Sequence, residues 1–293
     1  MIFEGTFTAI VTPFRSDGSV DLRALGELCE WQIESRIDGL VPCGSTGESA
    51  TLSPEEHVSV VRHVVDVAAG RVPVIAGTGS NSTREAVEFT RHARDLGADG
   101  ALLISPYYNR PTQEGIFLHF RAIAEETGFP LVPYNVPGRT ASRIEPETLA
   151  RLSRVPNVVG LKEAGADLVK TAETIAQSDP GFVVLSGDDA LTLPMLAIGA
   201  RGVISTISNV APQQTASILR AYLGGDLARA RAVHYELLPL MQTLFIETNP
   251  IPVKSALHIL GRIPDPVLRL PLTPLTRSSR ERLEAVLANA KPA

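Results

Sequence analysis

The sequence has few of the features that mark secreted, zinc-binding or membrane proteins. Only two cysteines occur in 293 residues, Cys29 and Cys43, and they lack CxxC spacing, so we expect neither a disulfide framework nor a thiolate zinc site. No apolar run is long enough to span a bilayer. The N-terminal segment Met1–Gly5 lacks the basic and apolar regions of a secretory signal. We therefore expect a cytoplasmic protein without a membrane partner.

Charge is not concentrated in any part of the chain. The formal net charge is −5 and no block of Lys and Arg occurs, which argues against nucleic acid as the main partner. The six histidines show no paired ligand spacing, and Asp188-Asp189 are placed to cap a helix, so we expect no metal. Lysine is scarce, with 23 arginines against four lysines: Lys162, Lys170, Lys254 and Lys291. A lysine away from the surface therefore calls for a chemical explanation.

Short apolar runs alternate with longer helical patterns at intervals of roughly 20 to 35 residues, as in successive βα units. Several runs are almost continuously apolar, which is typical of parallel strands covered by helices. Helix-start signals such as Ser53-Pro54-Glu55-Glu56 lie between them. Eight equal units predict an α/β fold, a (β/α)₈ TIM barrel. The predicted strands are Thr6–Phe14, Gly39–Ser45, Val72–Gly77, Gly100–Tyr107, Pro130–Asn135, Val158–Glu163, Phe182–Gly187 and Gly202–Thr206.

The chain continues beyond the eighth strand as a helical extension. Its patterns predict helices over Asp226–Glu247, Pro250–Leu260 and Ser278–Asn289. No low-complexity linker separates this extension from the strands. We therefore predict a catalytic barrel over residues 1–224 and a C-terminal helical extension, residues 225–293, that packs on the barrel.

Lys162 is the strongest candidate for a catalytic residue. It lies late in the strand Val158–Glu163, and in this fold the active site lies at the carboxyl ends of the strands. Loss of solvation there can lower the pKa of a lysine toward about 7, and a neutral amine attacks a carbonyl carbon to form an imine. A structural ion pair with Glu163 is the alternative, but adjacent residues of a strand point to opposite faces. Lys170 is predicted on a solvated helix face, and Lys254 is predicted to be structural.

Other polar segments at the strand ends allow two interpretations each. The turn Gly44–Gly47 carries hydroxyls and backbone donors that suit a carboxylate, or it is a plain turn. Tyr134 can hold substrate or relay a proton and Arg139 can bind a carboxylate in bidentate fashion, or they pack and pair structurally. Tyr107 and Tyr108 equally suit an interface.

The segments GSTGES, SPYYNRPTQEG, YNVPGRT, GLKEA, SGDD and GVIS together resemble the dihydrodipicolinate synthase / N-acetylneuraminate lyase superfamily, and most closely its synthase branch. The matching stretches run from Gly5 to Lys254, nearly the whole chain. The resemblance implies a lyase that takes up pyruvate as an imine on Lys162 and condenses it with L-aspartate 4-semialdehyde. The product would be 4-hydroxytetrahydrodipicolinate, in the first committed step of lysine and diaminopimelate biosynthesis. It also implies that no separate cofactor is needed.

The resemblance also implies roles for individual residues. Tyr134, Ser45 and Tyr108 match a hydroxyl relay that moves protons, with Tyr108 contributed across a subunit interface. The protein is therefore expected to be a homo-oligomer, either a dimer or a tetramer built as a dimer of dimers. Arg139 matches the residue that receives the carboxylate of aspartate semialdehyde. The family's contacts to bound pyruvate correspond here to Thr46, Gly187 and the main chain of Ile204.

Two departures from the synthase pattern leave alternatives open. Ser45 stands where the synthases usually have Thr, and GSTGE also occurs in sugar-acid lyases, so a pyruvate-dependent aldolase acting on a sugar acid or another aldehyde is the alternative function. Pro54 replaces a His that helps to bind lysine in feedback-inhibited bacterial members. Other positions of that allosteric lysine site are matched by Ser49, His57, Asn81 and Glu85. A catalytically silent sensor and a metal-dependent barrel hydrolase are more distant alternatives.

Overall fold

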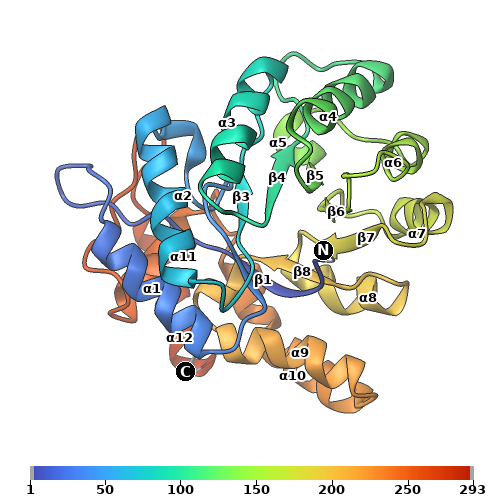
Figure 1. Ribbon diagram of the computed structural model, residues 1–293. Helices are drawn as coiled ribbons and strands as arrows, with labels where there is room; N and C mark the ends of the chain where they lie inside the picture. Colours follow the sequence, from blue (N-terminus) through green and yellow to red (C-terminus); the bar gives the residue numbers. More distant parts are fainter. Residues whose placement is uncertain (1–2, 291–293) are drawn as a thin grey trace. The chain divides into compact units, whose positions relative to one another are not determined.

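A computed structural model describes residues 3–290, and within them eight parallel strands alternate with helices (Figure 1). The strands have the sheet order β2-β1-β8-β7-β6-β5-β4-β3. The predicted fold class, a (β/α)₈ TIM barrel followed by C-terminal helices, is confirmed. The strands are β1 (Gly5–Ala9), β2 (Gly39–Val41), β3 (Ile75–Gly77), β4 (Gly100–Ile104), β5 (Leu131–Asn135), β6 (Gly160–Glu163), β7 (Val183–Ser186) and β8 (Gly202–Ser205).

Seven of the eight predicted strands contain an observed one and the first overlaps one, but the observed strands are shorter. The prediction Thr6–Phe14, for example, overlaps β1, which ends at Ala9. Beyond Ala9 the residues stay buried, with Phe14 fully enclosed, although they lie in a loop. An apolar run indicates which residues are buried, not which ones form hydrogen bonds with a neighbouring strand. It therefore overestimates the length of a strand.

Six of the helices begin at a residue whose side chain caps the first turn. The hydroxyl of Ser53 accepts a hydrogen bond from Glu56 N at 3.2 Å, and the Glu56 carboxylate accepts one from Ser53 N at 2.9 Å, forming a capping box. No helix within residues 3–290 combines the length and apolarity needed to cross a bilayer. The helices are α1 (Leu22–Glu34), α2 (Pro54–Ala68), α3 (Thr83–Asp95), α4 (Gln113–Thr127), α5 (Pro137–Thr140), α6 (Pro146–Leu152), α7 (Leu168–Gln177), α8 (Thr192–Ala197), α9 (Pro212–Leu223), α10 (Leu227–Thr243), α11 (Ile251–Ile259) and α12 (Arg277–Ala290), with short 3₁₀ turns η1 (Ser49–Thr51), η2 (Asp189–Leu191) and η3 (Ile207–Asn209).

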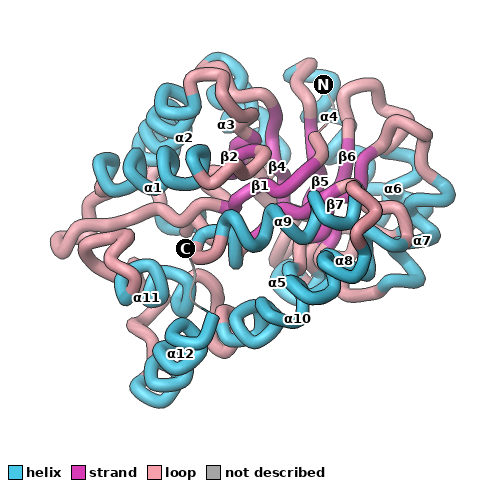
Figure 2. The backbone as a smooth tube through the Cα atoms, turned by 90° about the horizontal axis from the view of Figure 1, so that it is seen from below, coloured by secondary structure: helices cyan, strands magenta, loops and turns pink. Residues whose placement is uncertain are grey.

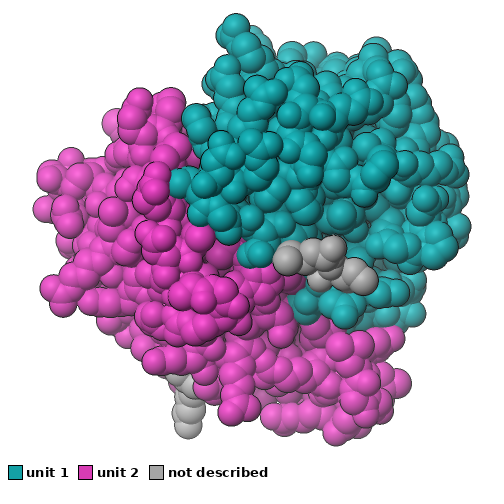
Figure 3. Space-filling model, viewed as in Figure 1, with its two compact units in different colours: residues 1–5, 75–204 teal, residues 6–74, 205–293 magenta. Residues whose placement is uncertain are grey.

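The chain divides into two compact units, coloured separately in Figure 3. Unit 1 comprises residues 1–5 and 75–204. Its strands β3 to β7 pair in parallel in chain order, and α3, α4, α6, α7 and α8 contact one another in sequence along their outer side (Figure 2). The core of unit 1 is mostly aliphatic and includes Leu103, Ile123, Leu131 and Leu161. This packing fixes the strands β5, β6 and β7 relative to one another.

Unit 2 comprises residues 6–74 and 205–293. In it β1 pairs with β2, α1 packs on α2, α9 packs on α10, and both α10 and α11 contact α12. The three helices predicted for the C-terminal extension are confirmed as α10, α11 and α12. The division of the chain into a barrel, 1–224, and an extension, 225–293, stays a prediction.

Candidate active site

Lys162 lies in β6 of unit 1, directly opposite Tyr134 of β5 in the strand register. The two residues are only 6% and 7% exposed, and Lys162 Nζ lies 4.2 Å from the centroid of the Tyr134 ring. The neighbouring Glu163 points to the other face, where its carboxylate accepts a hydrogen bond from Asn135 Nδ2 at 2.9 Å. Lys162 therefore contacts a phenol rather than a carboxylate of its own strand.

The surroundings of Lys162 favour its uncharged form. Burial lowers the pKa of Lys162 to about 7; the carboxylate of Asp189 opposes this shift and the guanidinium of Arg139 adds to it. Close to neutral pH a large share of the amine is thus free to act as a nucleophile. Burial also raises the pKa of Tyr134 to about 12, so its phenol stays protonated and can donate a hydrogen bond.

Gly187, at the end of β7, provides the space that the Lys162 side chain occupies. A Cβ atom at this position would lie 3.1 Å from Cε and Cγ of Lys162 and 2.8 Å from Cβ of Ala164. A side chain there would displace the lysine. Asp188, the next residue, accepts a hydrogen bond from Ala190 N at 2.9 Å, so the predicted helix cap is confirmed for Asp188.

Arg139 is exposed, on the single-turn helix α5 that follows β5. Its charge affects the pKa of both Lys162 and Tyr134, so it belongs to the same electrostatic environment. The loop beyond it is ordered by Thr140, whose Oγ1 accepts a hydrogen bond from Ser142 N at 3.1 Å. Unit 1 thus brings together four of the predicted residues, Lys162, Tyr134, Arg139 and Gly187; Ile204 is buried in β8.

Tyr108 is not part of this buried cluster. Its side chain is 89% exposed and its φ is +68°, an unusual backbone conformation for a bulky residue. The loop around it is held by Asn81, whose Nδ2 donates to Tyr107 O at 3.2 Å, and by Asn109, whose Nδ2 donates to Asn81 O at 2.9 Å. Glu85 lies in the first turn of α3. Within one chain the Tyr108 ring lies in solvent.

Ser45 and Thr46 belong to unit 2, on the loop that follows β2. Thr46 is buried, and its Oγ1 accepts a hydrogen bond from Asn249 Nδ2 at 2.9 Å. Thr12 Oγ1 donates to Gly47 O at 2.7 Å and fixes the same turn. The turn is therefore held both by the loop after β1 and by the segment that precedes α11.

Lys254 is completely buried in α11 and forms an ion pair that the sequence did not predict. Its Nζ lies 2.6 Å from Oε1 of Glu48, 2.7 Å from Val267 O and 4.0 Å from the centroid of the Phe14 ring. Oε2 of Glu48 accepts a hydrogen bond from Arg269 N at 3.2 Å. The sequence feature that could have indicated this ion pair is a lysine within a mostly apolar helix. The pair ties the C-terminal helices to the residue that ends the Gly44–Glu48 turn.

The remaining lysines offer no second nucleophile among the described residues. Lys170 forms an ion pair with Glu145 at the surface of unit 1, as expected for a solvated residue. Lys291 lies outside the described residues. Within residues 3–290, no group of three or more His, Cys, Asp or Glu side chains is arranged to hold a metal ion.

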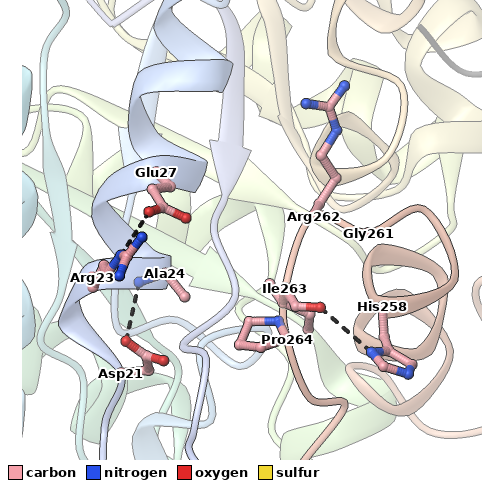
Figure 4. Close-up of a pocket in the computed structure, with 9 residues that line it drawn as sticks. All are labelled: Asp21, Arg23, Ala24, Glu27, His258, Gly261, Arg262, Ile263 and Pro264. Atoms are coloured by element: carbon pink, nitrogen blue, oxygen red, sulfur yellow. Dashed lines mark hydrogen bonds and ion pairs between the residues drawn. The ribbon is translucent and has the colours of Figure 1, made fainter.

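A cleft of about 520 Å³ in unit 2 lies beside α1 and the end of α11 (Figure 4). Its charged groups are satisfied locally: the Asp21 carboxylate caps α1, Arg23 Nε lies 2.9 Å from Oε1 of Glu27, and the Arg262 guanidinium carbon lies 4.0 Å from the Trp31 ring centroid. None of the predicted site residues lines this cleft. The predicted site residues therefore take no part in forming it.

The chain is similar to proteins of one family over its whole length. Residues 2–290 match the model of the dihydrodipicolinate synthetase family. A relative from Nitratidesulfovibrio vulgaris (strain DP4), named 4-hydroxy-tetrahydrodipicolinate synthase, is 56% identical over 99% of both chains. The crystal structure of dihydrodipicolinate synthase from Aquifex aeolicus has a TM-score of 0.97 at 46% identity, covering 99% of both chains. A chloride-inhibited dihydrodipicolinate synthase from Acinetobacter baumannii, complexed with pyruvate, has a TM-score of 0.96 at 45% identity and the same coverage.

A (β/α)₈ barrel with a buried lysine at the carboxyl end of a strand is typical of imine-forming lyases. Within that class, the full-length matches decide the family. The chain belongs to the dihydrodipicolinate synthetase family.

Proposed function

We propose that the chain condenses pyruvate with L-aspartate 4-semialdehyde to give 4-hydroxytetrahydrodipicolinate, and that Lys162 is the residue that forms the imine. The observation that carries this proposal is the amine of Lys162, buried beside Tyr134 with a pKa of about 7. A buried neutral amine next to a protonated phenol combines a nucleophile with a proton donor.

The chemistry proceeds in four steps. Lys162 Nζ attacks the keto carbon of pyruvate, and water leaves to give the imine. Loss of a methyl proton converts the imine to an enamine, whose carbon attacks the aldehyde carbon of aspartate semialdehyde. The substrate amine then adds to the imine carbon, closing the ring and releasing Lys162. The imine acts as the electron sink, so no separate cofactor is proposed.

The other matched residues take supporting roles. Tyr134 donates and accepts protons at Lys162, and the hydroxyl of Ser45 extends the relay. Thr46, Gly187 and the main chain of Ile204 contact pyruvate, and Arg139 receives the carboxylate of aspartate semialdehyde.

We propose that Tyr108 completes the relay from a second copy of the chain, in a dimer or a tetramer built as a dimer of dimers. Its 89% exposure in one chain and its positive φ support this role, because bulky residues hold such a conformation mainly where function requires it. A Tyr108→Phe chain mixed with a Lys162→Ala chain should recover part of the activity if the relay crosses between copies, and none if it acts within one chain.

The test of the main proposal is borohydride reduction in the presence of pyruvate, followed by peptide mass mapping. We expect one pyruvate adduct, on Lys162, that is lost in Lys162→Ala and kept in Lys170→Ala, which removes a surface lysine. Turnover of aspartate semialdehyde then decides the second substrate. An adduct on Lys162 with negligible turnover of this aldehyde would instead favour the sugar-acid aldolase, the function that Ser45 leaves open.

Ser49, His57, Asn81 and Glu85 are proposed as part of a regulatory lysine site. His57 is buried and Asn81 supports the Tyr107–Asn109 loop. Pro54 stands at the first position of α2. Inhibition of turnover by added L-lysine, reduced in Asn81→Ala, is the expected result; an unchanged rate at saturating lysine would exclude the site.

A further inference from the structure

Asn135 and Glu163 stand directly behind the two central residues of the candidate site. They pair in the strand register one position beyond Tyr134 and Lys162, and they are 1% and 6% exposed. Because side chains alternate along a strand, both face away from the lysine. The proposed chemistry uses neither group, although a buried carboxylate is costly unless its oxygens are paired.

The Asn135 side chain holds the end of the loop that carries Arg139. Its Oδ1 accepts a hydrogen bond from Ile144 N at 3.0 Å, and its Nδ2 donates to Ile144 O at 3.3 Å. Ile144 is 1% exposed, so these bonds are shielded from water. The loop therefore starts at the last residue of β5 and is returned to that same residue after one short helix.

Glu163 fixes which way the Asn135 amide points. One carboxylate oxygen accepts a hydrogen bond from Asn135 Nδ2 and the other accepts one from Gly165 N. Both oxygens face donors, so Glu163 acts only as an acceptor. If the Asn135 amide were reversed, its oxygen would face the carboxylate and its NH₂ group would face Ile144 N. The carboxylate excludes that arrangement.

We infer that Glu163 and Asn135 are positioning residues for Arg139, and so for recognition of the second substrate. The inference rests on the proposed function, in which Arg139 binds the carboxylate of aspartate semialdehyde. Through these hydrogen bonds the pair attaches the Arg139 loop to β5 and β6, the two strands that carry Tyr134 and Lys162. Pyruvate capture depends on the strands themselves and does not need the loop.

The substitution Glu163→Gln tests this role because it keeps the size of the side chain and removes one acceptor. The new amide has one acceptor oxygen for two donors, Asn135 Nδ2 and Gly165 N. Either Gly165 N loses its acceptor, or the Asn135 amide meets a donor or reverses and releases Ile144. The KM for aspartate semialdehyde should rise about tenfold, the effect expected when a buried donor is left unpaired. The yield of the pyruvate adduct on Lys162 should stay within about twofold, since the register of β5 and β6 is unchanged.

A swapped pair distinguishes positioning from general damage. In the double variant Asn135→Asp/Glu163→Gln, the new amide donates to the new carboxylate, which still accepts from Ile144 N but no longer donates to Ile144 O. The KM for aspartate semialdehyde should return part of the way to that of the parent. Glu145→Gln, which removes a surface ion pair with Lys170 in the same region, is the matched control and should leave the kinetics unchanged.

Amide hydrogen exchange measures how firmly the Arg139 loop is held, independently of catalytic activity. Glu163→Gln should speed exchange of the amides of residues 136–144, with the largest change at Ile144. If Glu163→Gln does not fold, Gln113→Ala serves instead: Gln113 Nε2 donates to Arg143 O at 2.8 Å and Oε1 accepts from Glu145 N at 3.1 Å, holding the same loop from α4. It should give the same pattern.

The two proposals fail in different ways. A parent enzyme that forms no pyruvate adduct or does not turn over aspartate semialdehyde overturns the proposed function. An active parent whose Glu163→Gln variant keeps its KM and its loop exchange, or loses adduct formation in equal measure, overturns the role of the Asn135–Glu163 pair.

Discussion

Replacing Lys162 with Met should stabilise the folded protein. The lysine is 6% exposed, and burial lowers its pKa from 10.5 to about 7, so the folded chain holds an amine that the unfolded chain would protonate. Methionine fills a similar volume without a charge to desolvate. The catalytic group is thus expected to be a cost to stability, as functional residues often are.

The size of this effect follows from linkage between protonation and folding. Between about pH 7 and pH 10.5 the unfolded chain binds a proton at Lys162 that the folded chain does not, so wild-type stability rises with pH across that window. The cost of the lysine is greatest below pH 7 and vanishes above its unfolded pKa. Near pH 7 it is about 4 kcal/mol, and near pH 9.5 about 1 kcal/mol.

Denaturant unfolding of the two proteins at matched protein concentration measures this difference. The free energy of unfolding of Lys162→Met should exceed that of the parent by the larger amount near neutral pH, and the gap should close as the pH rises. A variant less stable than its parent, or a gap that does not change with pH, would refute the reasoning that burial controls the charge of this lysine.

Three further expectations follow from the site and from unit 2. The kcat/KM for pyruvate should rise about tenfold per pH unit below pH 7 and then level off, because only neutral Lys162 attacks the ketone; a pH-independent profile from pH 5 to 9 would contradict this. Gly187→Ala should lower kcat/KM for pyruvate about tenfold or more, because its Cβ would meet the Lys162 side chain. Gly181→Ala is the control, since a Cβ there meets no atom within 4 Å. If both variants keep the parent's kcat/KM, Lys162 tolerates the added methyl group. Lys254→Met should lower the free energy of unfolding by about 3 to 5 kcal/mol, because it leaves Glu48 buried without its cation. The double variant Lys254→Met/Glu48→Gln should recover part of that loss, as measured by denaturant unfolding.

The sequence was sufficient to predict the strands and the burial of Lys162, because both depend on the local residue pattern. Apolar runs that alternate with helical patterns predicted all eight strands, and a lysine at the end of one such run predicted a buried amine. Capping residues such as Ser53 and Asp188 were also readable, since each bonds a backbone group within three residues of itself.

The contacts that the sequence did not reveal join residues far apart in the chain. Asn135 and Glu163 are 28 residues apart, and Glu48 and Lys254 are 206 residues apart. Neither pair has a spacing that a helix or strand period would bring together, so only the folded chain shows them. The role proposed for Tyr108 depends on a second copy of the chain, and its sequence pattern alone fits an interface and a proton relay equally well.

The buried pair between Lys254 and Glu48 limits how this protein can be shortened. A truncation before Asn249 would leave the Glu48 carboxylate without its cation in the interior of unit 2 and remove the amide that donates to Thr46. Residues 1–224 expressed alone would therefore keep every strand and the bond from Thr12 to Gly47, yet lose the contacts of Asn249 and Lys254 to the same turn. For engineering purposes the segment from Asn249 to Arg269 must be treated as a support of the Gly44–Glu48 turn, and fusions belong beyond Arg269, which still contacts Glu48.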